Sequence, residues 1–180
     1  MAVATYTSDL ILITTAETGV WGEITGFATG GTPTVPETDF FIQGSACVSQ
    51  STSGKTGTAV SMYFDYGSDL NAAITAGKCV FFWQVFTAAN AMDTFNNGGL
   101  RLGMGSDVGA FRMWKSGGND FGRNPYGGWM NIAIDPRNVS DYTIGAPTTV
   151  KRYFASWTNI LASISRGNPH ALDAIRYGRG

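Results

Sequence analysis

The amino-acid sequence predicts an all-β fold, an antiparallel β-sandwich or jelly roll with one short helix. Three features support this prediction: apolar and polar residues alternate with a period of two, glycines gather between the alternating segments, and one segment carries helix signals. The 180 residues suffice for one domain with a core of its own. We therefore expect a single sandwich domain over residues 1–180, with residues 1–39 as a candidate N-terminal arm and linker.

The predicted strands follow from the spacing of the apolar side chains. In residues 58–64, for example, Val60, Met62 and Phe64 fall on one face. The run 79–86 is apolar at nearly every position, which indicates a strand covered on both faces. Strands are predicted at residues 10–15, 41–50, 58–64, 79–86, 100–104, 110–115, 129–135, 150–157 and 171–177.

Glycines and helix caps mark where these strands end. The chain has 24 glycines, and pairs at 30–31, 98–99, 117–118 and 127–128 predict tight turns. Ser68 is a good N-cap for a helix over residues 69–76 that stops before Gly77. Residues 159–165 fit a strand or a helix, and residues 29–39 fit a linker or a long surface loop.

The composition excludes several classes of protein. Hydrophobic residues make up 43% of the chain and aromatic residues 13%, which excludes intrinsic disorder. Charged residues are only 14%, so Ser, Thr, Asn and Gly must cover much of the surface. A net charge of −1 and a pI near 5.7 argue against a nucleic-acid partner. No apolar stretch is long enough for a secretory leader or a membrane helix, so no membrane partner is expected.

Charge is distributed unevenly along the chain. The first 54 residues carry five acidic and no basic residues, whereas the rest carry 12 basic and eight acidic residues. Scatter at low charge density explains this, and so does an acidic N-terminal face that meets a basic neighbour. Because few lysines protect the sheet edges, we expect self-association or shell binding through residues 1–39. The closing Gly–Arg–Gly has turn composition, which is compatible with a further segment after it.

Two glycine-containing strings resemble nucleotide-binding motifs but fail on context. Ser53–Thr56 (SGKT) resembles the end of a phosphate-binding loop, yet Ser49 stands where that motif needs a glycine, and a strand follows. In Gly103–Gly109 (GMGSDVG) the third glycine of a dinucleotide fingerprint is misplaced, and a strand again follows. The SGKT string is expected to be a hairpin turn, and no cofactor is predicted.

Residues capable of catalysis or metal binding are sparse. His170 is the only histidine and is expected to be a turn residue or a partly buried hydrogen-bonding side chain. Asp65 and Asp69 come closest to a glycosidase carboxylate pair, but they flank a turn. The oxygen-rich stretch Asp135–Asp141 fits Asx turns better than a calcium loop. We predict no catalytic residue, no metal ligand and no enzymatic activity.

The two cysteines are expected to be buried, reduced thiols. Cys47 and Cys79 lie inside strand-like apolar runs and show no CxxC spacing. Because no secretory leader is visible, a reducing compartment is favoured over one in which a disulfide forms.

Aromatic residues provide the remaining signal for ligand binding. Trp114, Tyr126 and Trp129 stand beside glycines or in loops, where an exposed ring stacks on a sugar or anchors a protein interface. Core packing explains Trp114 equally well and Trp129 better. These three residues are the ligand-binding candidates that the sequence offers.

Five segments carry a resemblance to known proteins: FFIQGSACVSQ, KCVFFWQVFTA, GLRLGMGSD, NPYGGWMNIAIDP and LDAIRYGRG. With their GGW and DAIxYG landmarks they resemble concanavalin A-like lectin/glucanase domains, and more narrowly those in virion structural proteins of tailed bacteriophages. The resemblance extends over residues 8–180. The glucanase acid motif and the legume-type metal ligands are missing from this chain, which favours a structural role.

The resemblance implies a virion protein assembled in the cytoplasm of a host bacterium. A non-enzymatic decoration or cement protein of the capsid is the leading hypothesis. Its partners are then the major capsid protein, other virion proteins and further copies of the same chain. A carbohydrate-binding module of a tail or fibre protein, with a glycan as partner, is the alternative, and a glycoside hydrolase is the third hypothesis.

Overall fold

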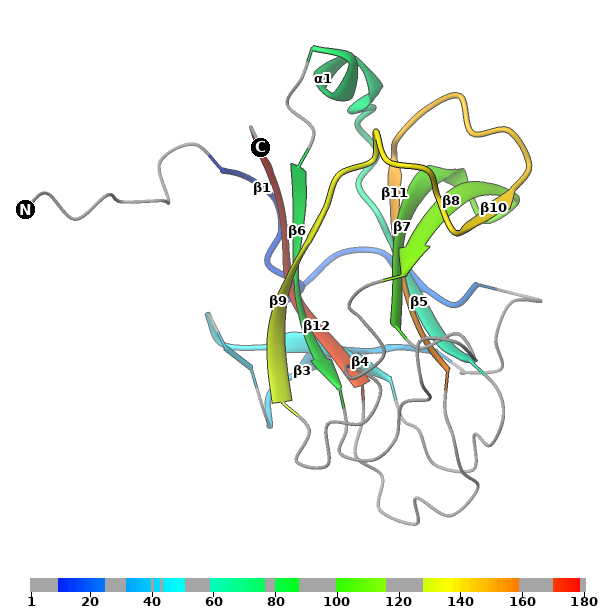
Figure 1. Cartoon of the computed structure of the whole chain (residues 1–180). Helices are drawn as coiled ribbons and strands as arrows, with labels where there is room; N and C mark the ends of the chain where they lie inside the picture. The colour runs from blue at the N-terminus through cyan, green and yellow to red at the C-terminus, as the bar shows by residue number, and fades with distance from the viewer. Residues whose placement is uncertain are drawn as a thin grey trace, which may run out of the picture.

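Two antiparallel sheets packed face to face form the molecule, with one short helix at one end of the sandwich (Figure 1). The computed structural model describes residues 10–24, 32–39, 41–42, 44–50, 59–76, 80–87, 100–115, 128–158 and 170–178. Every strand pairing in these ranges is antiparallel. The predicted all-β sandwich with a short helix is therefore confirmed.

The first sheet, here called sheet A, is organised around a long central strand, β12. One edge of β12 pairs with β4 near its start and with β1 near its end, and the other edge pairs with β6. The order is β3–β4–β12–β6–β9 with β1 off this path. Its strands are β1 (Ile11–Thr14), β3 (Thr34–Glu37), β4 (Cys47–Gln50), β6 (Val80–Thr87), β9 (Gly128–Ile134) and β12 (His170–Gly178).

The second sheet, sheet B, has the order β10–β8–β7–β11–β5–β2. Successive strands of the chain often lie in different sheets: β5 precedes β6 of sheet A, and β9 of sheet A precedes β10. This alternation between layers is typical of a jelly roll. The strands of sheet B are β2 (Trp21–Gly22), β5 (Ala59–Asp65), β7 (Leu100–Asp107), β8 (Ala110–Lys115), β10 (Tyr142–Ile144) and β11 (Arg152–Thr158).

Residues 1–39 do not form an arm where the structure describes them. They supply β1 and β3 to sheet A and β2 to sheet B. Residues 29–39, for which a linker and a long surface loop were both considered, contain β3, which pairs with β4. In the segment 41–50 the predicted strand is shorter than expected, because Gly44 adopts a positive φ of 70° and pairing begins only at β4.

The helix α1 (Asn71–Thr75) begins later than predicted, and Ser68 does not cap it. The N-cap position is Leu70, and its side chain makes no capping hydrogen bond. Instead, Asp69 Oδ1 accepts hydrogen bonds from the backbone N–H of Asn71 at 2.9 Å and of Val150 at 2.8 Å. A partner about 80 residues away in the sequence thus fixes where the helix starts, which local capping rules do not anticipate.

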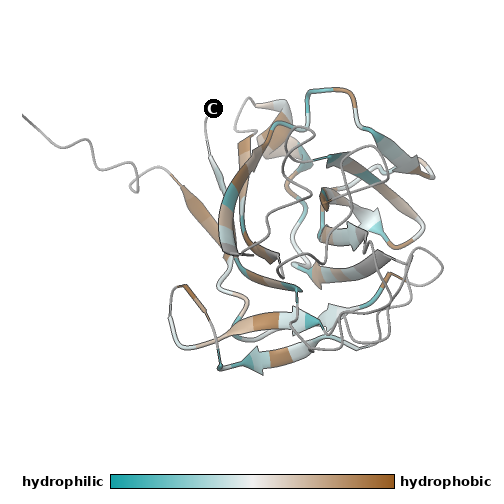
Figure 2. Ribbon diagram, turned by 60° about the horizontal axis from the view of Figure 1, so that its bottom comes forward, coloured by the Kyte–Doolittle hydropathy of each residue, from teal (hydrophilic) through white to brown (hydrophobic). Residues whose placement is uncertain are grey.

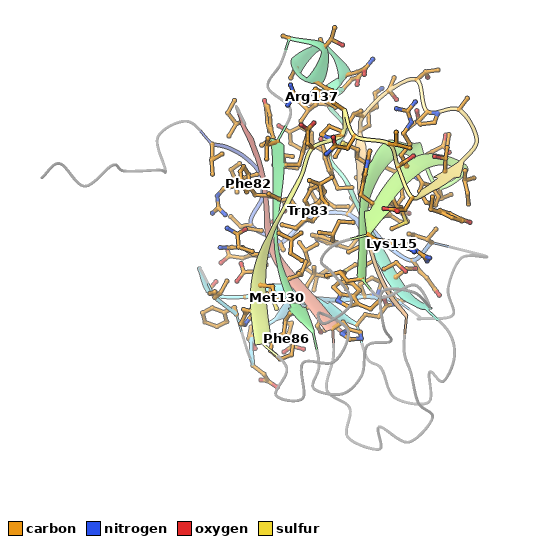
Figure 3. All side chains as sticks on the ribbon, viewed as in Figure 1. Phe82, Trp83, Phe86, Lys115, Met130 and Arg137 are labelled. Carbon is orange, nitrogen blue, oxygen red and sulfur yellow. The ribbon has the colours of Figure 1, made fainter. Side chains whose placement is uncertain are left out.

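The main core lies between the two sheets. Its largest fully buried side chains include Phe81 and Trp83 from sheet A and Tyr153 and Trp157 from sheet B. Figure 3 shows Trp83 between the sheets and its neighbour Phe82 on the other side of sheet A. The same alternation gives many strands mixed brown and teal colouring in Figure 2.

A second apolar cluster covers the opposite face of sheet B. Ile24, Phe111, Met113 and Phe154 are all 0% exposed there. Gly103 lies across from Met113 and from Phe154 in the strand register, and a Cβ at this glycine would collide with the Arg112 carbonyl oxygen. The absence of a side chain at this position therefore leaves room for the large neighbours.

Several predicted features lie outside the described residues: the SGKT string, residues 159–165, Cys79 and Tyr126. The other glycine string, Gly103–Gly109, forms the end of β7 and the turn into β8, so no helix follows it. In the ranges that the structure describes, no helix has the length and apolar character needed to cross a membrane.

Candidate ligand-binding pocket

The β7–β8 hairpin brings an arginine and a tryptophan onto the inner face of sheet B. Across the hairpin, Met104 pairs with Arg112 and Leu102 pairs with Trp114. Leu102, Met104 and Trp114 pack in the core between the sheets. Because Arg112 is two residues from Trp114 on the same strand, it shares this face, yet its side chain is exposed.

A pocket of about 410 Å³ lies beside these side chains. Three segments build it around the hairpin: α1, the turn after β9, and the segment between β10 and β11. Pockets that bind small molecules commonly measure about 300–1,000 Å³, so this one falls within that range. Its lining residues are Asn71, Ile74, Met104, Arg112, Trp114, Pro136, Pro147, Thr148, Thr149 and Val150.

Hydrogen bonds hold the segment 147–150 against both α1 and β7. Asp69 joins Asn71 of the helix to Val150, and the Leu70 N–H donates to the Val150 carbonyl at 2.9 Å. On the other side, Ser106 Oγ accepts from the N–H groups of Thr148 at 3.0 Å and Thr149 at 3.1 Å. These contacts fix two walls of the pocket without any ligand.

The turn after β9 is fixed in the same way. Asp135 accepts a hydrogen bond from the Arg137 N–H at 2.9 Å and forms an ion pair with its guanidinium at 2.6 Å. The Asn138 carbonyl at the end of this turn accepts the Trp114 indole N–H at 2.9 Å. Figure 3 shows Arg137 at the end of the molecule that carries α1. The turn therefore orients the indole ring that lines the pocket.

Among the described residues that line the pocket, one carries a charge, Arg112. The ion pairs of the described chain join other residues, Arg137 to Asp135 and Arg152 to Asp65. The two nearby carboxylates are engaged elsewhere. Hydrogen bonds from the backbone of Val150 and Asn71 lower the pKa of Asp69, and the Arg137 side chain lowers the pKa of Asp135.

The predicted aromatic candidates do not form one site. Trp114 lines the pocket but is only 5% exposed, so most of its ring packs in the core. Trp129 is half-buried on the outer face of sheet A, where it meets Phe86 edge-on at 5.5 Å between ring centroids. Tyr126 lies outside the described residues. The structure thus supports a pocket at Trp114 and separates it from Trp129.

His170 is neither a turn residue nor partly buried. It is the first residue of β12, its exposed fraction is 0%, and its ring stacks on Trp157 at 5.1 Å with an interplanar angle of 4°. Burial lowers the pKa of His170 to about 3. A fully buried imidazole that is neutral near pH 7 and stacked on a core tryptophan acts in packing rather than in proton transfer to a substrate.

The acidic residues considered for catalysis or metal binding have structural partners. Asp65 accepts hydrogen bonds from Arg152 Nε at 3.1 Å and Nη2 at 3.0 Å, while Asp69 holds α1. Asp135 forms the predicted Asx-type turn. Within the described ranges, no group of three His, Cys, Asp or Glu residues is placed to hold a metal ion.

Cys47 is buried as predicted, and burial, with smaller contributions from Asp173 and Glu37, raises the pKa of its thiol to about 12.

Sequence reasoning missed most of the pocket. Asn71, Thr148 and Thr149 carry no pattern that distinguishes them from ordinary surface residues, and only the fold brings them together. Arg112 was missed as well, although in AFRMWK it has the same strand parity as Trp114, a signal that could have placed a charge on the face of that tryptophan.

Comparisons with known proteins support the fold. No protein-family model matches the chain, and no curated protein sequence matches it. Among solved structures, the family 11 carbohydrate-binding module from Clostridium thermocellum, in complex with a β-1,3-1,4-mixed-linked tetrasaccharide, matches with a TM-score of 0.57. The match covers 96% of both chains at 11% sequence identity. The chain therefore has a jelly-roll β-sandwich fold like that of the module, although the two sequences have little in common.

Proposed function

We propose that this protein binds carbohydrate without cleaving it and that the pocket beside Trp114 holds part of the glycan. The observation that carries the proposal is the chemistry of that pocket. The half-buried Ile74, Pro136 and Pro147 supply apolar surface for a sugar ring beside the exposed edge of Trp114. The polar residues Asn71, Thr148 and Thr149 can hydrogen-bond its hydroxyl groups.

Two further observations support binding at this place. The walls are held by Asp69, Ser106 and Asp135 before any ligand arrives, which reduces the entropy lost on binding. The structurally similar module was solved with a tetrasaccharide, and its fold covers nearly the whole chain. A fold hosts many functions, so the pocket and not the likeness is what the proposal depends on.

The absence of cleavage is part of the proposal. Glycoside hydrolysis generally uses two carboxyl groups on either side of the scissile bond. Where the structure describes the pocket lining, it contains no Asp and no Glu. Asp65 and Asp69, the pair considered from the sequence, are held by Arg152 and by backbone N–H groups.

The virion hypothesis, with its capsid partners and its location in a phage particle, stays a prediction from the sequence resemblance. None of the contacts described above favours it over glycan binding.

Isothermal titration calorimetry with a panel of soluble oligosaccharides tests the proposal, and the β-1,3-1,4-mixed-linked tetrasaccharide belongs in that panel. We expect at least one oligosaccharide to bind and Asn71→Ala to weaken that binding. Asn131→Ala is the matched control, because Asn131 is an exposed asparagine on the outer face of sheet A near Trp129. If no oligosaccharide binds, or if only Asn131→Ala weakens binding, the pocket is not a glycan site.

A further inference from the structure

The pocket has a donor without a matching acceptor. Arg112 presents up to five N–H donors and no acceptor, and no other described residue of the lining is charged. In the part of the chain that the structure describes, the guanidinium has no carboxylate partner, since the ion pairs there involve Arg137 and Arg152. A cation in a pocket whose other described lining residues are uncharged favours an anionic ligand.

The surrounding acids do not cancel this charge directly. Asp69 uses one oxygen to accept two backbone N–H groups, at 2.9 Å and 2.8 Å. Asp135 accepts the Arg137 guanidinium through both of its oxygens, at 2.9 Å and 2.6 Å. Both carboxylates are thus committed to holding the walls, and Arg112 remains available to the pocket.

A neutral sugar would use this site poorly. Each sugar hydroxyl is both a donor and an acceptor, so a site for neutral sugars gains from carboxylates that accept from these hydroxyls. The described residues of the lining offer no carboxylate. A carboxylate at C6 of a sugar accepts only, and its two oxygens match the planar fork of a guanidinium. Resting on the function proposed above, we infer that the glycan is acidic and that Arg112 binds the carboxylate of a uronic acid residue.

Three matched ligand pairs test this inference. Each pair compares the methyl glycoside of glucose, galactose or mannose with the methyl glycoside of the corresponding uronic acid, so the two ligands differ only at C6. Affinities are measured by nuclear magnetic resonance through the indole N–H signal of Trp114, a residue of the pocket wall. At least one uronic acid is expected to bind about tenfold or more tightly than its neutral partner, as one charge-assisted hydrogen-bonded pair provides.

Two variants locate the effect. Arg112→Gln is expected to remove the preference for the acid, and Arg112→Lys to restore part of it because the charge is kept and the fork is lost. Arg101→Gln is the control, because Arg101 lies on the other face of sheet B, over the Tyr142 ring at 5.8 Å. An unchanged preference in Arg101→Gln, with intact folding of every variant by circular dichroism, supports the inference.

Failure of the inference and failure of the proposed function give different results. If neutral glycosides bind as tightly as the acids and Arg112→Gln has no effect, the pocket binds sugar but not through a carboxylate. If no glycoside and no longer oligosaccharide shifts the Trp114 signal, the pocket is not a saccharide site at all. An equal loss of preference in Arg112→Gln and Arg101→Gln would also overturn the inference, because the effect would then be one of overall charge.

Discussion

His170 makes the stability of this protein depend on pH in a window where few other groups titrate. The side chain is 0% exposed and stacks on Trp157, and burial lowers its pKa from 6.5 to about 3. In the unfolded chain the imidazole takes up a proton below about pH 6.5. Between those two values only the unfolded state is protonated, so the folded state loses stability as the pH falls.

The magnitude follows from the shift. One pKa unit corresponds to about 1.4 kcal/mol, so each pH unit below about 6.5 removes about that much stability until the folded-state pKa is reached. Between pH 6.5 and pH 5, above the range in which carboxyl groups titrate, the expected loss is about 2 kcal/mol. That loss is a substantial fraction of a typical total of about 5–15 kcal/mol.

Urea unfolding at several pH values between 7 and 5 measures this, for the wild type and for His170→Phe. The phenyl ring keeps the stacking on Trp157 and never takes up a proton, and the chain has no second histidine to confuse the comparison. The free energy of unfolding of the wild type should fall with pH while that of His170→Phe stays nearly level. Parallel curves for the two proteins would refute the reasoning, because the folded state would then bind the proton as readily as the unfolded chain.

Three more predictions follow from single contacts. Gly103→Ala should lower the stability by about 1–3 kcal/mol, because the new Cβ would collide with the Arg112 carbonyl and approach Met113 Cγ at 2.7 Å. In the control Gly109→Ala, the new Cβ meets the Asp107 carboxylate at 3.3 Å, so the melting temperature should change little. In a Cys79→Ser background, Cys47 should react with iodoacetamide at pH 8 at least about 100-fold faster when urea unfolds the protein than in buffer. The reason is that the folded-state pKa of its thiol is about 12, so little thiolate is present before unfolding. Equal rates would contradict its burial. Asp69→Ala should weaken glycan binding several-fold, because it releases Val150 from α1. The control Asp107→Ala loses a comparable hydrogen bond, from the Gly109 N–H at 2.7 Å outside the pocket, and should bind glycan normally. Equal affinities for the two variants would contradict a preformed wall.

The fold was largely predictable because strand periodicity depends on a simple requirement. One face of each strand must be buried, and that requirement repeats every two residues, so β8 and β12 have nearly the predicted bounds. Where a distant partner decided the outcome, prediction failed. Asp69 rather than Ser68 sets the start of α1 because Val150 shares the carboxylate. His170 begins a strand that pairs with Gln50 of β4, and its ring stacks on Trp157.

The candidate site was predictable only in part for the same reason. Trp114 stood out as an aromatic residue, but nothing local separates a ring that lines a pocket from Trp129, which packs against Phe86. The remaining walls come from segments that are far apart in the sequence, from Asn71 to Val150, and their meeting depends on the whole sandwich. Arg112 could have been found as well, since it has the same strand parity as Trp114, but it was not among the candidates predicted from the sequence.

A map of chemical-shift changes across the backbone amides and indole N–H groups tests most directly whether the pocket is the glycan site. The protein is titrated with the oligosaccharide or uronic acid that binds best. The largest changes are predicted at Asn71, Arg112 and Thr149 and at the indole N–H of Trp114, all from the pocket wall. Changes centred on Trp129 and Phe86 at the outer face of sheet A, with none around Arg112, would contradict the account.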